Sequence, residues 1–388
     1  LWHFGEQLAL NDETRALLHP LYHLTFETKH QVCLHGYLLA VRASYPEFYI
    51  STVRGLLDME STAWLGATIA LRTDYDDELF TQSLDALEKK WIEPRLFTVL
   101  RFGRAIELVP PERAGRLLRQ LSEDSVQDSL FLLIELLDSI PFNDSSPFNS
   151  DFVFDLVSQF VPGEENRDEM HGYHWKNVCS KMIKWDANYR LPLLDALLTA
   201  MGKVYRLSYD SNVVPLANEL VQADPIGSWS VVKAHFERSL PEWRDDLFQW
   251  LKSSLSGFDE KDSRGAIADL RVPEILDWIK DDPEPRSVLM AHAAPGTLDD
   301  EYGGRLTREL LYRYGQFDGV RSGISATFHS GGWTGPASDY LKRKREKFRR
   351  WLAAGFEIEI SQWIEAEIEY LDRNIEREEI DEERSRFD

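Results

Sequence analysis

The sequence predicts an all-α fold, specifically an α-solenoid of stacked antiparallel helical hairpins. Three observations lead to this prediction. Apolar residues recur at helical spacing along most of the chain, and no segment of strand length alternates polar and apolar residues convincingly. The helical segments are short and are separated by short joins. Finally, one stretch with the length of a helix pair occurs twice, and a recurring pair needs neighbours to bury its apolar face.

The repeated stretch is the most informative of the three. Residues 175–202 read WKNVCSKMIKWDANYRLPLLDALLTAMG, and residues 229–256, 54 positions later, read WSVVKAHFERSLPEWRDDLFQWLKSSLS. The matched positions are apolar in both copies: Trp175 with Trp229, Val178 with Val232, Met182 with Phe236, Leu194 with Phe248, Leu197 with Leu251 and Met201 with Leu255. Each copy predicts two short amphipathic helices, with its first tryptophan in the core.

Composition narrows the function classes. Apolar residues make up 43% of the 388 residues, which is enough for a packed core. The net charge of -22 repels DNA, RNA and anionic lipid, so nucleic acid is an unfavourable partner. No run approaches 18 apolar residues, so we expect no membrane span.

The cysteine content and the first residue add two further expectations. The chain has only 2 cysteines, Cys33 and Cys179, which is too few for a disulfide framework and favours a reducing compartment, the cytoplasm. Leu1 opens the chain without a methionine, which suggests that the sequence begins inside a longer protein.

We predict four segments along the chain. Residues 1–75 form an N-terminal helical segment with breaks at Pro20 and Pro46. Residues 76–140 form a helical-hairpin array over DELFTQSLDALEKKW, PRLFTVLRFGRAIELV, PPERAGRLLRQLS and SVQDSLFLLIELLDSI. Residues 141–150, PFNDSSPFNS, are the best candidate linker. Residues 151–335 form a helical-repeat array that holds both copies and ends in an irregular Gly-rich segment, 315–335.

The fourth segment, residues 336–388, is predicted as a terminal hairpin of one basic and one acidic helix. Seven Lys and Arg lie between Lys342 and Arg350, and thirteen Asp and Glu lie between Glu357 and Asp388. The two helices are expected to pack antiparallel with their charges paired across the rim. Contact between the basic run and nucleic acid stays an open alternative, although the acidic neighbour weakens its field.

No recognised catalytic motif is present. The chain lacks a Gly-x4-Gly-Lys-Ser/Thr loop, a Gly-x-Ser-x-Gly elbow and a His-Glu-x2-His pair. His171, His174 and Cys179 have a spacing that could hold a soft metal, with Asp168 or Glu169 as a fourth ligand. Because Cys179 belongs to the apolar stripe of the repeat, we predict no metal, no cofactor and no enzymatic activity. The alternatives are a metal-dependent hydrolase built on these histidines and a purely structural spacer.

Several phrases resemble a known class of helical regions. RFGRAIELVPPERAGRLLRQL, the repeated Trp units and FHSGGWTGPASDYLKRKREKFRRWL resemble the HEAT- or armadillo-like regions at the C-terminal ends of large bacterial multidomain proteins. Several of those are similar to STAND-type NTPases of antiphage defence. The resemblance implies a sensor or scaffold module that binds a protein, such as a phage protein or another domain of the same polypeptide.

A protein-binding module needs exposed anchors, and large aromatic side chains are the usual ones. The candidates are the aromatic residues off the matched stripe and those in the Gly-rich segment: Trp185, Tyr189, Trp243, Trp250, Phe328, His329 and Trp333. We expect replacement of Trp243 and Trp250 by alanine to weaken partner binding more than folding. Burial of Phe328 and Trp333 at the end of the stack is the alternative for those two residues.

Overall fold

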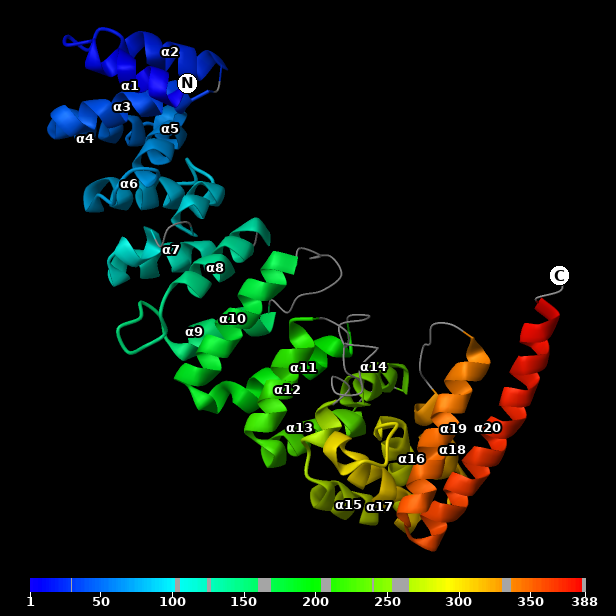
Figure 1. The fold of residues 1–388 in the computed structure, drawn as a ribbon. Helices are drawn as coiled ribbons and strands as arrows, with labels where there is room; N and C mark the ends of the chain where they lie inside the picture. The colour runs from blue at the N-terminus through cyan, green and yellow to red at the C-terminus, as the bar shows by residue number, and fades with distance from the viewer. Residues whose placement is uncertain are drawn as a thin grey trace. The chain divides into compact units, whose positions relative to one another are not determined.

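The computed structural model describes residues 1–28, 30–101, 105–123, 127–159, 169–203, 211–238, 241–252, 265–329 and 336–385. Within these ranges the chain is all-helical and has no strand, which confirms the predicted fold class at that level (Figure 1). The helices fall into two compact units, the first ending at Asp186 and the second running from Ala187 to Asp388. No helix of the described residues has both the length and the apolar character needed to cross a bilayer.

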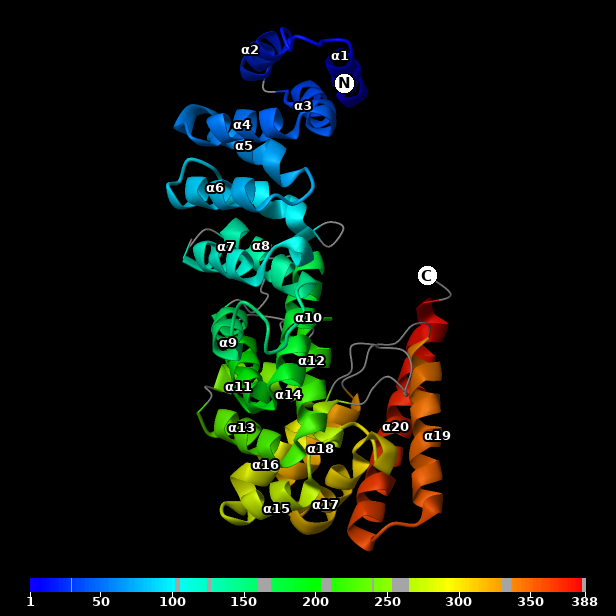
Figure 2. The ribbon, with the colours of Figure 1, turned by 90° about the vertical axis from the view of Figure 1, so that its left-hand side faces the viewer.

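The first unit holds ten α-helices and two 3-10 helices among its described residues. They are α1 (Trp2–Leu10), α2 (Leu18–Thr28), α3 (Val32–Ser44), α4 (Pro46–Leu57), α5 (Glu60–Leu71), α6 (Asp77–Glu88), η1 (Pro94–Arg101), η2 (Ala105–Leu108), α7 (Pro111–Glu123), α8 (Gln127–Ser139), α9 (Ser150–Gln159) and α10 (Glu169–Trp185). Successive helices pack on one another from α3 to α8, and α10 packs on α8 and α9 (Figure 2).

The second unit continues with helices of similar length until the last two. Its described elements are η3 (Ala187–Tyr189), α11 (Arg190–Met201), α12 (Val213–Ala223), α13 (Pro225–Arg238), α14 (Pro241–Lys252), η6 (Ala266–Ala268), α15 (Val272–Lys280), α16 (Pro283–Ala293), η7 (Asp300–Tyr302), α17 (Gly304–Tyr314), α18 (Asp318–His329), α19 (Ala337–Ala354) and α20 (Ile358–Ser385). In both units an α-helix packs mainly on α-helices that come no more than three helices before or after it in the chain.

Helix starts follow local sequence signals. Pro46 and Pro111 open α4 and α7, where the missing N–H of proline costs no hydrogen bond. The Asp76 carboxylate caps α6 by accepting a hydrogen bond from the Leu79 N–H at 3.0 Å. Helices α6, α7 and α8 therefore lie where the sequence predicts them. The expected helix at residues 94–109 is instead the two 3-10 helices η1 and η2.

The two copies of the repeat map onto α10 with α11 and onto α13 with α14. All matched side chains that the structure describes are buried: Trp175, Val178, Met182, Leu194, Leu197, Met201, Trp229, Val232, Phe236, Phe248 and Leu251. Leu255, the partner of Met201, lies outside the described residues. Burial in both copies explains why these positions stay apolar, and it places both tryptophans in the core as predicted.

The segment predicted as an irregular Gly-rich loop is largely helical, and this expectation was wrong for residues 318–329, which form α18. Its glycines allow close packing instead of tight turns. A Cβ at Gly319 would lie 2.7 Å from Val288 Cγ2, and one at Gly323 would lie 3.0 Å from Ala291 Cβ, both on α16. Larger residues would push the two helices apart.

Helices α19 and α20 form the predicted terminal hairpin (Figure 1). Lys342 Nζ lies 2.6 Å from a Glu379 oxygen, and Arg345 Nη1 lies 2.8 Å from an Asp372 oxygen. Contacts that run forward along α19 and backward along α20 show that the helices are antiparallel. Beneath these pairs the apolar stripe of α20 is buried at Ile360, Trp363, Ile364, Leu371 and Ile375, whereas Ile368 of the same stripe is half-buried.

Candidate functional site

The predicted anchor residues that the structure describes are divided between the two units. Trp185 ends α10 in the first unit, whereas Tyr189, Trp250, Phe328 and His329 belong to the second unit. Tyr189 is half-buried and precedes the first residue of α11. The side chain of Trp243 and all of Trp333 lie outside the described residues. Each remaining candidate therefore has to be judged by its own surroundings.

Trp250 is a core residue, and the expectation that it is an exposed anchor was wrong. Its side chain is fully buried on α14. The indole Nε1–H donates a hydrogen bond of 3.1 Å to Asn218 Oδ1 on α12. A tryptophan whose ring is covered and whose N–H is already bonded offers nothing to a partner.

Phe328 and His329 join α18 to the terminal hairpin. The Phe328 ring is buried, with ring centroids 5.4 Å from Phe348, 5.7 Å from Trp351 and 5.2 Å from Trp363. Phe328 is thus a packing residue, which is the alternative that the sequence left open. His329 Nε2 lies 2.7 Å from Glu367 Oε2, so this half-buried imidazole holds α20.

Trp185 lies in a cluster of partly exposed aromatic rings with Phe142, Phe148 and Phe152, which we call the aromatic cluster. The ring centroid of Trp185 is 5.8 Å from that of Phe142 and 6.1 Å from that of Phe148, both in edge-on contacts. Phe142 and Phe148 are 5.1 Å apart, and Phe152 is 6.4 Å from Phe148. All four rings are half-buried, so they remain accessible. Trp185 is therefore a predicted anchor that lies among several other accessible rings.

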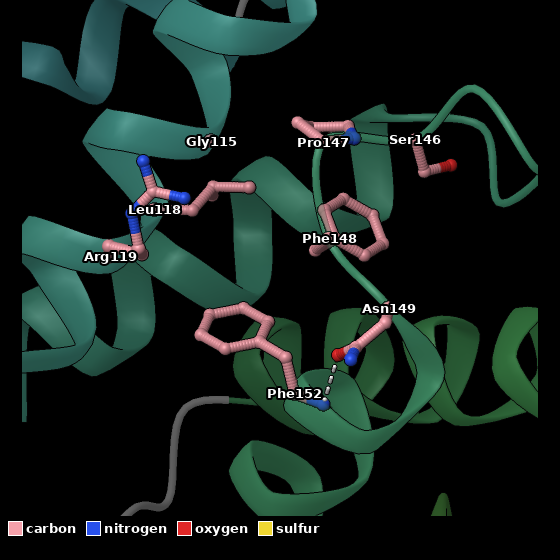
Figure 3. Close-up of a pocket in the computed structure, with 8 residues that line it drawn as sticks. All are labelled: Gly115, Leu118, Arg119, Ser146, Pro147, Phe148, Asn149 and Phe152. Carbon is pink, nitrogen blue, oxygen red and sulfur yellow. Dashed lines mark hydrogen bonds between the residues drawn. The ribbon is translucent and has the colours of Figure 1, made fainter.

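A pocket of about 410 Å³ opens beside the aromatic cluster, and we call it the Arg119 pocket. Figure 3 shows that it lies between α7, which contributes Leu118 and Arg119, and the chain around the start of α9, where Phe148 precedes the helix and Phe152 belongs to it. Asn149 also lines it, and its Oδ1 accepts a hydrogen bond of 2.9 Å from the Phe152 N–H. The volume falls within the range of about 300–1,000 Å³ typical of ligand sites.

A second pocket of about 530 Å³ adjoins the first, because Ser146 and Pro147 line both. Its apolar wall includes Ile140, and Glu107 and Lys181 are its charged residues. We call it the Lys181 pocket. Residues 141–149 therefore separate two hollows, and they connect α8 and α9 within a single unit.

Gly115 of α7 allows this segment to approach the helix. A Cβ at Gly115 would lie 2.9 Å from the Pro147 carbonyl oxygen, which is closer than real Cβ atoms come to backbone. The segment is also held from within, since Ser146 Oγ donates to the Pro141 carbonyl oxygen at 2.8 Å and accepts from the Asn143 N–H at 2.9 Å. Specific contacts therefore hold residues 141–149, which form part of the wall of both pockets, in place.

The histidines that suggested a metal site are engaged separately. The His171 ring stacks on Phe131 with centroids 3.8 Å apart, and His174 Nδ1 lies 2.7 Å from Asp138 Oδ2. Complete burial raises the pKa of the Cys179 thiol well above its usual value. Among the described residues, no group of three or more His, Cys, Asp or Glu side chains is arranged to hold a metal ion.

Asp138 gathers several polar groups near the Lys181 pocket. Burial tends to raise the pKa of its carboxyl, but hydrogen bonds from His174 and Asn177 and the charge of Lys181 outweigh this and lower the pKa. The Lys181 ammonium lies 3.3 Å from Asp138 Oδ1. Asp138 therefore stays ionised and ties α10 to the end of α8.

The sequence interpretation missed most of this site. Phe142 and Phe148 stand in a polar segment that was interpreted as a linker, and two phenylalanines among Asn, Asp and Ser were the available signal. Arg119 gave no signal of its own, because arginines recur along α7. Comparison of the chain with protein-family models, curated proteins and solved structures finds no match to any of them.

Proposed function

We propose that this chain is a protein-binding module that recognises its partner at the aromatic cluster and the two pockets beside it. The observation that carries the proposal is the half-buried Trp185 packed among Phe142, Phe148 and Phe152 next to hollows of about 410 and 530 Å³. Rigid aromatic rings at the edge of a pocket are typical of residues that dominate binding energy, because they bury large apolar area at a small cost in conformational entropy.

The same proposal includes a solenoid architecture of HEAT- or armadillo-like hairpins. Two observations support it. Helices pack mainly on near neighbours in the chain, and both copies of the repeat bury the same positions. A stack of such pairs would present a continuous surface on which loops like residues 141–149 can carry recognition.

The biological setting rests on the sequence resemblance alone. We propose a sensor or scaffold role within a larger bacterial defence protein, with a phage protein or another domain of the same polypeptide as the partner. The free thiols of Cys33 and Cys179 support a reducing, cytoplasmic setting. The role is recognition and not catalysis, and the site proposed for it consists of aromatic and apolar walls with few charges.

Site-specific photo-crosslinking tests this proposal. A benzophenone amino acid replaces Ser145, which is exposed and lines the Lys181 pocket, and a second variant carries it at Ser61, which is also exposed and lies on α5, as the matched control. The full chain is expressed in bacteria with and without phage infection. We expect a discrete adduct of higher mass from position 145 that is missing from position 61 and is reduced by Trp185→Ala. Equal adducts at both positions, or none at position 145 in either culture, would refute the proposal.

A further inference from the structure

The three arginines on one side of α7 differ in how they are neutralised. Arg113, Arg116 and Arg119 follow one another at intervals of three residues. Arg113 Nε lies 3.4 Å from Asp77 Oδ1, and Arg116 Nη2 lies 2.7 Å from Asp85 Oδ1, both acids being on α6. Arg119 is exposed and forms no ion pair within the part of the chain that the structure describes. Arg119 therefore leaves an uncompensated positive charge at the edge of the pocket.

Two side chains at the Arg119 pocket, Arg119 and Asn149, can still donate hydrogen bonds to a ligand. Arg119 carries a guanidinium, which cannot accept. Asn149 uses its Oδ1 to cap α9, so its amide NH2 remains to donate. Ser146 already donates to Pro141 and accepts from Asn143. A ligand that satisfies this pocket must therefore bring an acceptor, and a carboxylate suits a guanidinium best because the two can form paired charge-assisted hydrogen bonds.

The rest of the pocket selects an apolar group. Leu118, Phe148 and Phe152 present carbon surface toward the hollow in Figure 3, with Arg119 at one edge. The Lys181 pocket adjoins it across Ser146 and Pro147, so two neighbouring side chains of one extended segment fit the pair of hollows better than one compact molecule does. The net negative charge of the chain argues against a nucleic acid or an anionic membrane as the source of the anion.

We propose that the Arg119 pocket binds a short peptide segment of the partner, in which an aromatic or long aliphatic side chain fills the hollow and a nearby aspartate or glutamate pairs with Arg119. This inference rests on the proposed protein-binding function and specifies the chemistry of the partner. The apolar side chain supplies burial against Phe148 and Phe152, and the carboxylate supplies orientation and selectivity.

A charge-swap experiment tests the inference. Fluorescein-labelled peptides of Gly and Ser carry one Asp two residues before one Phe, and matched peptides replace the Asp by Lys or the Phe by Ala. Binding to the full chain is measured by fluorescence anisotropy. The wild type should prefer the Asp peptide over the Lys peptide by about tenfold or more, as expected for a charged hydrogen bond. Arg119→Glu should reverse this preference, and the Ala peptide should bind weakly to both proteins.

Arg350→Glu is the matched control, because Arg350 is exposed on α19 and its replacement changes the net charge equally. It should leave the wild-type preference intact. The inference is overturned if Arg119→Glu keeps the wild-type preference, if Arg350→Glu reverses it too, or if the Phe and Ala peptides bind alike. Competition by 3-phenylpropanoate as strong as that by the peptide would also overturn it, by assigning the pocket to a small carboxylate.

The two proposals can fail separately. If the crosslink at position 145 captures a partner but the peptides show no dependence on Arg119, the protein-binding function stands and the acidic peptide is refuted. If no crosslink forms at that position and the charge swap succeeds, the proposed function is refuted and only the preference of the pocket for an acidic peptide stands. Thermal unfolding followed by circular dichroism confirms that both arginine variants are folded, as expected for exposed side chains.

Discussion

The replacement Trp250→Ala separates a core role from a binding role most sharply. The sequence suggested that this change would weaken partner binding more than folding, whereas the buried indole leads us to expect the opposite. Deleting a large buried aromatic side chain typically costs about 3–5 kcal/mol, because apolar contacts are lost and a cavity remains. The bond to Asn218 adds little to this cost, since the Asn218 side chain is half-buried and water can replace the indole N–H.

The assay is thermal unfolding by calorimetry and circular dichroism. For a unit of this size, each kcal/mol lowers the melting temperature by about 2–4 °C, so Trp250→Ala should lower the transition of the second unit by about 6–20 °C. Trp250→Phe, which keeps most of the apolar volume, should shift it far less. Trp185→Ala is the matched control in the first unit, where the half-buried ring should matter less for stability. A shift for Trp250→Ala no larger than that for Trp185→Ala would show that our account of Trp250 is incorrect.

Three further predictions test other contacts. Gly36→Ala should detach α1 from α3 and expose α1 to limited proteolysis, because a Cβ at Gly36 would lie 2.1 Å from the Trp2 carbonyl oxygen; unchanged cleavage would contradict this packing. Asp138 has a folded pKa below the unfolded value near 3.8, so the stability that it contributes is present above that value and lost as the pH falls through the folded pKa. Asp138→Asn should therefore lower the free energy of unfolding at pH 7, and urea titrations should show the difference from wild type shrinking in acid. Glu367→Ala should loosen α20 from α18 by about 1.5–3 kcal/mol for each charged hydrogen bond lost, with faster amide hydrogen exchange in α20 as the measurement; exchange at the wild-type rate would argue against the His329–Glu367 contact.

Much of the fold follows from local signals in the chain. Prolines and a capping aspartate mark helix starts at Pro46, Pro111 and Asp76, and these signals act within one turn of the helix. The apolar stripes of the repeat and of α20 predict the buried positions, because a helix shows a constant face to its neighbours. The sequence failed at α18, where Gly319 and Gly323 suggested turns but serve close packing against α16.

The candidate site was less accessible to sequence reasoning. Aromatic residues off the repeat stripe were treated alike, yet Trp250 is buried and Trp185 is partly exposed. The difference arises from residues distant in the chain: Asn218 of α12 bonds Trp250, while Phe142 and Phe148 contact Trp185 across about forty positions. Arg119 likewise became notable only when its neighbours Arg113 and Arg116 proved to be paired with acids of α6.

The sequence by itself thus determined that the described part of this protein is all-helical, where several of its helices begin, and which faces of the repeated helices and of α20 are apolar, because these properties depend on residues within a few turns of one another. Only the tertiary structure decided which aromatic rings remain accessible, that Arg119 forms no ion pair among the described residues, and where pockets form. Those properties depend on how side chains from α7, α9, α10 and the segment 141–149 meet in space.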